Sequence, residues 1–435
     1  FNEVTRMILD VYREYALVDP KLNARVSSGH PEEFFRLLAE FSSTGSNVLS
    51  IFNDDVIIRA NAKMGKAVRD CRLYVGGGCQ ENVLENTEIN SRATMYMSLP
   101  GVLLMGFFPE RWDELARRDG FVVVPLHTAR TFEEFYAAFL RNLRSVIGAH
   151  VAARNRTEAE GARYNPCPLH SATISDCIER ARDMMAGGAR YSFGSVSLAG
   201  IGTLIDSLYA VKVVVFDQER LSLTRLRDIL AADFEGEEAL RQYIVNRIPK
   251  FGHGDPGMRE FSTRVFADVA RACSGYQNTR GGTYEASLFS FRSFVDFGRR
   301  GGATPDGRHA GEHLSPGMSP SQLALGRECN VTQVLRALEP VDMTDYPVVA
   351  VLDVKMPLLP EQANPSVLES VVRCFVDYGG SVIEINVVDP SALADAREHP
   401  ERHPDLVVRV SGYSAYFRTL SPDIQQEVVT RALAR

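Results

Sequence analysis

The stretch Arg409-Val410-Ser411-Gly412-Tyr413-Ser414-Ala415-Tyr416-Phe417 lies close to the end of this 435-residue chain and decides how the rest is interpreted. Residues that favour β-structure, 406 to 410, lead directly into a single glycine between Ser411 and Tyr413. Glycine accepts backbone conformations that strain other residues, and it commonly ends a strand at a turn. Taken alone, the stretch therefore predicts a strand followed by a glycine turn.

A second glycine-rich stretch, Gly76-Gly77-Gly78-Cys79-Gln80-Glu81, lies far upstream. The preceding residues, Leu73 to Val75, predict a short strand, so the glycines would form a loop that carries Cys79. By itself such a loop indicates only close packing, and a lone cysteine is most often a small buried apolar residue. Residues two apart on an extended segment point to the same face, so we expect Glu81 beside Cys79.

Together, the two stretches resemble the glycyl radical enzymes, the family of pyruvate formate-lyase and its dehydratase, lyase and decarboxylase relatives. Gly412 matches the radical-bearing loop of that family, and Cys79 matches the catalytic cysteine in its Gly-Cys-x-Glu form. The resemblance covers nearly the whole chain. Further segments match the family in the same order: Phe52–Asp55, Gly302–Arg308, Gly379–Asp389, Leu393–Ala396 and His399–Glu401.

The resemblance implies a division of labour between a glycine and a cysteine. Loss of an α-hydrogen leaves a planar carbon radical that the adjacent amide nitrogen and carbonyl delocalise, and a Cβ would crowd that carbon. Gly412 would store the radical, a thiyl radical on Cys79 would take a hydrogen from the substrate, and Glu81 would act as general base or acid. The residues around the glycine would order its loop or be recognised by an activating enzyme: Arg409, Val410, Ser411 and Tyr413.

The same resemblance implies a protein-based radical with no bound cofactor and no metal. A separate activating enzyme, using S-adenosylmethionine and an iron–sulfur cluster, would install the radical without oxygen. The chain has seven scattered cysteines and no Cys-x-x-Cys pair, so we expect neither a zinc site nor an iron–sulfur cluster in it. That sets aside the anaerobic ribonucleotide reductases, which carry a cysteine-rich zinc site near the radical loop. The expected partners are the activating enzyme and a small-molecule substrate, and a homodimer is left open.

The residues around the cysteine favour one type of reaction. Pyruvate formate-lyase uses two adjacent cysteines, whereas Gly78 precedes Cys79 here, which disfavours acyl transfer of the formate acetyltransferase type. The Gly-Cys-x-Glu form resembles the eliminating enzymes, so we expect a dehydratase, or a carbon–nitrogen or carbon–sulfur lyase, acting on a small hydroxylated substrate. Arylacetate decarboxylases share this form and remain an alternative. A catalytically silent radical-carrying partner is a further alternative, disfavoured because the chain keeps both loops. Gln80 stands where valine is common, and the sequence gives no reason for it.

Composition narrows the class of protein only slightly. A net charge of −7, a pI near 5.8 and the lack of a basic stripe argue against nucleic-acid binding. No apolar run is long enough to span a bilayer, and nothing resembles a signal peptide. Scattered cysteines suit a reducing compartment, so the expected location is the cytoplasm.

Apolar periodicity predicts helices that alternate with strands, an α/β fold. We expect strands at 22–26, 48–52, 73–75, 122–125, 284–291, 348–354 and 381–388. We expect helices at 31–41, 62–70, 111–118, 131–155, 174–186, 203–213, 221–231, 237–246 and 261–272. The resemblance implies half of a ten-stranded α/β barrel with surrounding helices, residues 1–297, followed by a glycyl radical domain, residues 298–435. Family members are much longer, and the chain opens at Phe1 within an amphipathic pattern, so we expect a C-terminal half that lacks part of its pocket.

Overall fold

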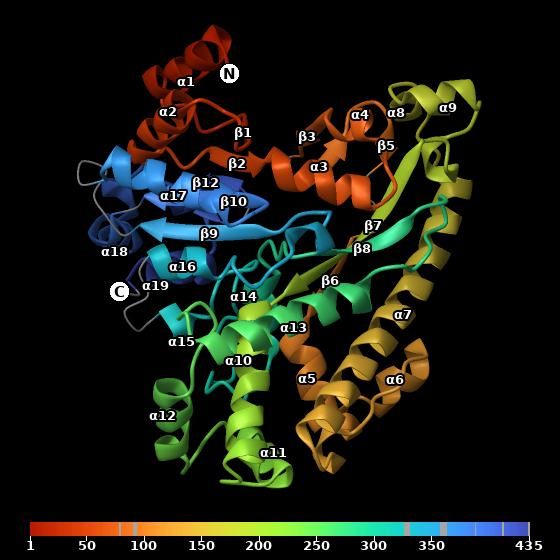
Figure 1. Ribbon diagram of the computed structural model, residues 1–435, viewed down its shortest axis with the longest axis vertical. Helices are drawn as coiled ribbons and strands as arrows, with labels where there is room; N and C mark the ends of the chain where they lie inside the picture. The colour runs from red at the N-terminus through yellow and green to blue at the C-terminus, as the bar shows by residue number, and fades with distance from the viewer. Residues whose placement is uncertain are drawn as a thin grey trace.

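The computed structural model describes residues 1–77, 80–89, 94–325, 331–356, 363–387, 389–410 and 413–433. Over these residues the chain has a mixed α/β fold (Figure 1). One four-stranded sheet has the order β1-β2-β10-β9. Its strands are β1 (Leu22–Val26), β2 (Leu49–Asn53), β9 (Val351–Met356) and β10 (Val382–Val387).

The two middle strands of this sheet come from opposite ends of the chain. β2 is parallel to β1 and β10 is parallel to β9, but β10 and β2 pair antiparallel, with Glu384 opposite Ser50. Every residue of β2 and β10 is buried, which is typical of strands covered on both faces. Helix α2 (Glu32–Ser43) turns its phenylalanines and leucines inward and packs against β10 and α17 (Pro365–Asp377).

A second sheet is built around β7 (Tyr191–Ala199). β5 (Glu88–Ile89), β6 (Met95–Ser98) and β8 (Thr283–Ser287) all pair with β7 in parallel. An isolated parallel bridge between Leu288 and Ala350 connects the end of β8 to the start of β9. The strands of the two sheets therefore meet at one edge, as Figure 1 shows near the centre of the molecule.

Long helices cover the second sheet. α7 (Phe132–Tyr164) begins at the N-cap Thr131, which accepts a hydrogen bond from the Glu134 N–H, and runs along one side of the molecule in Figure 1. It packs against α5 (Leu99–Phe107) and α13 (Pro256–Cys273), and α10 (Ile201–Val211) packs against both of those helices. Buried apolar residues of these helices and of the first sheet form one continuous core.

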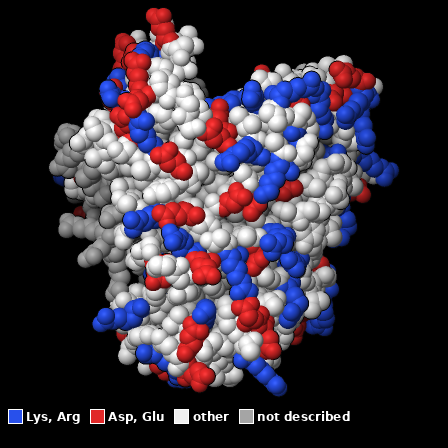
Figure 2. All heavy atoms as spheres, viewed as in Figure 1, with Lys and Arg blue, Asp and Glu red and all other residues white. Residues whose placement is uncertain are grey.

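The other helices are short or peripheral. They are α1 (Glu3–Glu14), α3 (Asp54–Lys63), α4 (Val68–Cys71), α6 (Asp113–Asp119), α8 (Pro168–Ser171), α9 (Ser175–Glu179), α11 (Leu223–Ala231), α12 (Glu238–Arg247), α14 (Ser293–Arg300), α15 (Gln322–Leu325), α16 (Val331–Arg336), α18 (Pro390–Glu398) and α19 (Pro422–Leu433). On the face drawn in Figure 2, acidic and basic side chains are interspersed.

Most expected elements are present, but several predictions are wrong. Residues 122–125 form no strand, because the Asn142 side chain bonds both the N–H and the C=O of Val124, at 2.6 and 2.9 Å, where a neighbouring strand would. The helix expected over 62–70 is not continuous: its first residues end α3, which begins at the N-cap Asn53, and its last residues begin α4, with no helix over 64–67. The helix expected over 174–186 breaks after α9, where Ala181 adopts a left-handed φ of 47°. The central strand β7 was not predicted.

Candidate functional site

A short hairpin carries the cysteine motif. Strands β3 (Tyr74–Gly76) and β4 (Asn82–Leu84) pair antiparallel, and we call residues 74–84 the cysteine hairpin. Two backbone bonds close its turn, from Gly77 N–H to Glu81 O at 2.6 Å and from Gln80 N–H to Gly77 O at 3.2 Å. Gly78 and Cys79, between these residues, lie outside the described part of the chain.

Close packing against the main sheet explains one of the glycines. A Cβ on Gly76 would lie 2.8 Å from Cζ of Phe52 on β2 and 2.7 Å from Nδ2 of Asn23 on β1. The same Asn23 nitrogen donates to the Gly76 carbonyl at 3.1 Å. Only a residue without a side chain lets the hairpin lie this close to β1 and β2.

The first strand of the hairpin is fastened by a charged pair. Arg25 and Asp54 form two parallel hydrogen bonds of 2.8 and 2.9 Å, and Tyr74 donates its hydroxyl to Asp54 at 2.6 Å. Arg25 also donates to the Tyr74 carbonyl at 3.0 Å and lies over its ring, 4.1 Å from the centroid. Burial, and to a lesser extent the Asp54 carboxylate, raise the pKa of the Tyr74 phenol, and the charge of Arg25 only partly opposes this rise. Tyr74 therefore stays a neutral donor.

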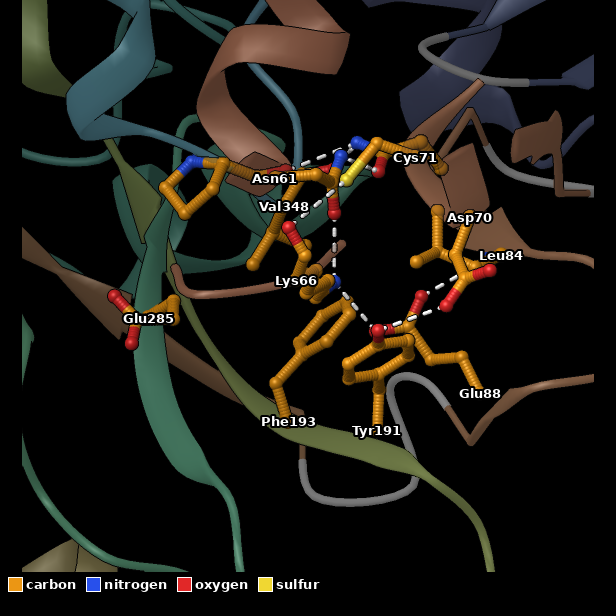
Figure 3. Close-up of polar contacts among 12 residues, drawn as sticks. Asn61, Lys66, Asp70, Cys71, Leu84, Glu88, Tyr191, Phe193, Glu285 and Val348 are labelled. Carbon is orange, nitrogen blue, oxygen red and sulfur yellow. Dashed lines mark hydrogen bonds and ion pairs between the residues drawn. The ribbon is translucent and has the colours of Figure 1, made fainter. Parts of the chain in front are cut away.

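The second strand is fastened by a buried polar cluster (Figure 3). Lys66 forms an ion pair with Glu88 at 2.5 Å and donates to Asn61 Oδ1 at 2.6 Å. Glu88 in turn accepts the Leu84 N–H at 2.9 Å, and Asn61 donates to Asn82 Oδ1 at 2.7 Å. Both β4 contacts thus depend on one lysine whose side chain is 4% exposed.

Glu81 lies at the end of the turn, two residues after the cysteine, and is half-buried. Burial raises the pKa of its carboxyl, opposed by a hydrogen bond to its own backbone and by the charge of Lys21. A carboxyl whose pKa is raised toward neutrality can exchange a proton with substrate more readily than an exposed one. The position and the pKa both suit a general acid or base.

A second hairpin carries the glycine motif. Strands β11 (Val407–Val410) and β12 (Tyr413–Tyr416) pair antiparallel with Arg409 opposite Ser414, and we call residues 407–416 the glycine hairpin. Ser411 and Gly412, which connect the strands, lie outside the described residues. The hairpin packs through Val408 against a small cluster that includes Leu393 of α18.

The two hairpins meet at the Ser50–Glu384 pair of the main sheet. Arg409 of the glycine hairpin forms an ion pair with Glu384 and donates to Ser50 Oγ at 2.8 Å. Gln80 of the cysteine hairpin donates to the same oxygen of Glu384, Oε1, and lies 3.4 Å from Ser50 Oγ. Ser50, Gln80 and Glu384 are fully buried, and Arg409 is 3% exposed.

This meeting point is a strongly polar spot inside the core. Burial would raise the pKa of Glu384, but the guanidinium of Arg409 outweighs it and holds that pKa below its usual value. Arg409 also donates to the Asn47 carbonyl at 3.1 Å and to Ser414 at 3.3 Å. One ionised carboxylate therefore links the main sheet to both hairpins.

The segment Gly302–Arg308 forms a turn whose residues 303–308 are buried. Thr304 and Arg308 close it with a backbone bond of 3.0 Å. Asp306 accepts from Ser207 of α10 at 3.2 Å, and its carbonyl accepts from Lys250 at 3.1 Å. Burial lowers the pKa of Arg308 despite nearby acidic residues. The turn fastens the segment before the glycine hairpin to the helical region.

Other residues singled out in the sequence lie in less suggestive places. His253 is half-buried, with Nε2 2.8 Å from the Ala324 carbonyl. Glu285 of β8 lines a pocket of about 310 Å³ beside α13, and burial raises its pKa. Arg409 is buried, so in this state it orders the glycine hairpin from within; its recognition by an activating enzyme stays a prediction. The side chains of Val410 and Tyr413 lie outside the described part.

Sequence reasoning missed Ser50 and Glu384 as site residues. A signal for Glu384 was present, since it is the one charged residue in the buried run Val382–Val387, and a carboxylate is rarely buried without a cation. Ser50 carried no such signal. Its role depends on the antiparallel pairing of β2 with β10, which joins residues 334 positions apart.

Three further observations concern the described residues alone. None of their helices combines the length and the apolar character that crossing a membrane requires. They contain no group of three or more histidine, cysteine or acidic residues placed to hold a metal ion. Their cysteines are free thiols: Cys71, Cys167, Cys177, Cys273 and Cys374.

Comparisons with known proteins cover most of the chain. A family model described as pyruvate formate lyase-like matches residues 1–298, and one described as glycine radical matches residues 347–418. Trans-4-hydroxy-L-proline dehydratase of Clostridioides difficile is 30% identical over 441 residues, 99% of this chain and 54% of that protein. A probable dehydratase of Escherichia coli is 30% identical over 457 residues, 99% of this chain and 55% of that protein.

The fold is also similar to a solved structure. That structure, described as 1,2-propanediol dehydration in Roseburia inulinivorans, superposes with a TM-score of 0.90 at 27% identity, covering 99% of this chain and 55% of its own. The chain therefore spans about half the length of the relatives it matches.

Proposed function

The chain belongs to the pyruvate formate-lyase-like family of glycyl radical enzymes, and on that premise we propose that it is part of a radical dehydratase or related lyase that acts on a small hydroxylated molecule. One observation carries the proposal: Gln80, the residue after Cys79, and Arg409, three residues before Gly412, bind the same oxygen of Glu384. The segments that bear the expected radical-storing and radical-transferring residues thus converge on one point.

The proposed chemistry begins outside the site. A radical S-adenosylmethionine activating enzyme takes one α-hydrogen atom from Gly412. In the closed protein the Gly412 radical takes the hydrogen atom of the Cys79 thiol, which regenerates glycine and leaves a thiyl radical. The thiyl radical then takes a hydrogen atom from a carbon of the substrate that bears a hydroxyl group.

Glu81 enters at the elimination step. Its carboxylate accepts the proton of that hydroxyl, and the leaving group on the neighbouring carbon departs with its bonding electrons. The product radical takes a hydrogen atom back from Cys79, and the thiyl radical so formed is returned to Gly412. The raised pKa of Glu81 supports this role, because a base poised nearer neutrality can also return the proton to the leaving group.

Dehydration is the favoured elimination, and a half-barrel is the favoured architecture. The two relatives described above, each 30% identical, are named as a dehydratase and a probable dehydratase, and the chain keeps the Glu81 that such an elimination needs. The strands of the two sheets meet at the Leu288–Ala350 bridge, which supports an arc that a further segment closes into a barrel. We place the barrel region at residues 1–297 and the glycyl radical domain at residues 298–435.

The test is anaerobic electron paramagnetic resonance of the full-length protein, produced with its activating enzyme. We expect a doublet from the α-hydrogen that remains on Gly412, absent in Gly412→Ala. Cys79→Ala keeps the doublet but forms no product from any of a panel of vicinal diols, hydroxyprolines and hydroxysulfonates. A wild type without the doublet, or a Cys79→Ala variant with full turnover, refutes the proposal. Turnover of arylacetates alone would reassign the reaction to decarboxylation.

A further inference from the structure

Gln80 has an unusual position for a residue next to a reactive cysteine. Its side chain is fully buried, and its backbone φ of 76° lies in the left-handed region that strains residues other than glycine. Its amide oxygen Oε1 is buried and has no hydrogen-bond partner among the described residues. Both features cost stability, and such costs persist where the surroundings fix a residue for function.

The contacts of Gln80 show what fixes it. Nε2 faces Oε1 of Glu384, and the amide must be oriented this way because its oxygen would repel the carboxylate. Glu384 is held in turn by Arg409, and both contact Ser50. The side chain therefore reaches past its own hairpin to the point where the glycine hairpin is anchored.

From this geometry we infer that Gln80 is a positioning residue that holds the cysteine hairpin in register with the glycine hairpin, through the Glu384–Arg409 ion pair that both share. The inference rests on the proposed radical function and adds to it the group that couples the two segments. Because Gln80 is bonded directly to Cys79, a tether on Gln80 limits where the neighbouring residue can lie relative to the glycine hairpin.

Three variants of the full-length protein test this coupling. Gln80→Met keeps the length of the side chain but has no N–H donor. Gln80→Glu keeps its shape but replaces the donor with a second carboxylate against Glu384. The matched control is Gln242→Met on the exposed face of α12, which removes the same kind of bond, from Gln242 Nε2 to Glu238 Oε1 at 2.7 Å, far along the chain.

Each variant is measured in three ways after anaerobic activation. Radical content comes from electron paramagnetic resonance, kcat and KM from product formation, and local opening from hydrogen–deuterium exchange of residues 74–77, 80–84, 407–410 and 413–416. In both Gln80 variants we expect radical content and KM close to wild type and a kcat lower by about 10- to 100-fold, the loss that a misplaced reacting group causes. Exchange quickens in both hairpins. Gln242→Met matches wild type throughout.

Other results overturn the inference. It fails if a Gln80 variant keeps the wild-type kcat, or if radical content falls in parallel with kcat, since the residue would then act in activation or folding. It also fails if exchange quickens in the cysteine hairpin alone, because the two hairpins are then not coupled through this residue. A wild type that forms no radical refutes the proposed function itself, which separates the two failures.

Discussion

Removing the cation at the meeting point of the two hairpins tests the electrostatic reasoning most directly. Arg409→Met leaves the carboxylate of Glu384, whose side chain is 0% exposed, without its ion-pair partner. Breaking a buried ion pair by removing one partner costs about 3–5 kcal/mol, because the remaining charge stays desolvated. Arg409 also supplies bonds to Ser50 and to the Asn47 carbonyl, so we expect the upper part of this range for opening of the glycine hairpin.

Two companion variants sharpen the test. Arg409→Met combined with Glu384→Met replaces the whole pair by apolar groups, and such replacements are often neutral or stabilising. We therefore expect the double variant to recover most of the loss. Arg299→Met is the control, since its pair with Asp423 at 2.6 Å is about half exposed and is worth roughly 0–1 kcal/mol.

Hydrogen–deuterium exchange of residues 407–410 and 413–416 measures the opening free energy locally. Where exchange follows the opening equilibrium, a loss of 3 kcal/mol quickens it about 150-fold. An Arg409→Met variant whose opening free energy stays within about 1 kcal/mol of wild type, the value of an exposed pair, would show that the buried pair does not anchor the hairpin. A double variant no better than the single would show that desolvated charge is not the cause.

Three further predictions follow from the site. Because burial raises the pKa of Glu81, we expect kcat/KM to fall as the pH drops through a value above the ordinary glutamate pKa of about 4.3. In Glu81→Gln this fall at acid pH is absent, and kcat is lower by about 100-fold or more. Because the pKa of Glu81 is higher in the folded than in the unfolded state, its contribution to stability is lost as the pH rises through the folded-state pKa. At alkaline pH we therefore expect Glu81→Gln to have a higher melting temperature than the wild type, and equal melting temperatures at all pH values would contradict the shift. Gly76→Ala places a Cβ 2.8 Å from Phe52 and costs about 1–3 kcal/mol in denaturant unfolding; an unchanged midpoint would mean that the hairpin has room to move. Lys66→Met leaves Glu88 buried and unpaired, which lowers the free energy of unfolding by about 3–5 kcal/mol. We expect hydrogen–deuterium exchange to quicken more in residues 80–84 than in the glycine hairpin, and an equal change in both would contradict a local role.

Local sequence patterns predicted those helices and strands whose formation depends on residues close together in the chain. The strands that lead into the two glycine motifs and many of the amphipathic helices were expected because turns, β-formers and apolar periodicity act over a few residues, whereas the return strands β4 and β12 were not predicted. Strand β7 was not predicted because it contains Gly194 and three serines, a composition that disfavours a strand. Its glycine is explained only by packing, since a Cβ there would lie 2.4 Å from the ring of Tyr284 on β8.

The candidate site divides in the same way. Cys79, Glu81 and Gly412 could be named because a motif lies on contiguous residues; their roles stay predictions. The partners of Gln80 could not be named, since Glu384 is 304 positions away and reaches it only through the pairing of β10 with β2. The Gln80 side chain, which the sequence leaves unexplained, becomes interpretable once long-range pairing places a carboxylate beside it.

The carboxylate of Glu384, which both hairpins share, also makes opening of the glycine hairpin depend on pH. Arg409 balances the charge of Glu384 in the closed glycine hairpin, and the proposed activating enzyme, if it draws Gly412 outward, would carry the guanidinium away. A buried carboxylate that loses its cation binds a proton far more readily, so opening of the hairpin takes up a proton and proceeds more easily as pH falls. Under the proposed mechanism turnover needs the opposite, because Glu81 would have to be ionised to accept a proton. Installation of the radical would therefore be fastest at a lower pH than substrate turnover, and a brief drop in pH would favour the first over the second.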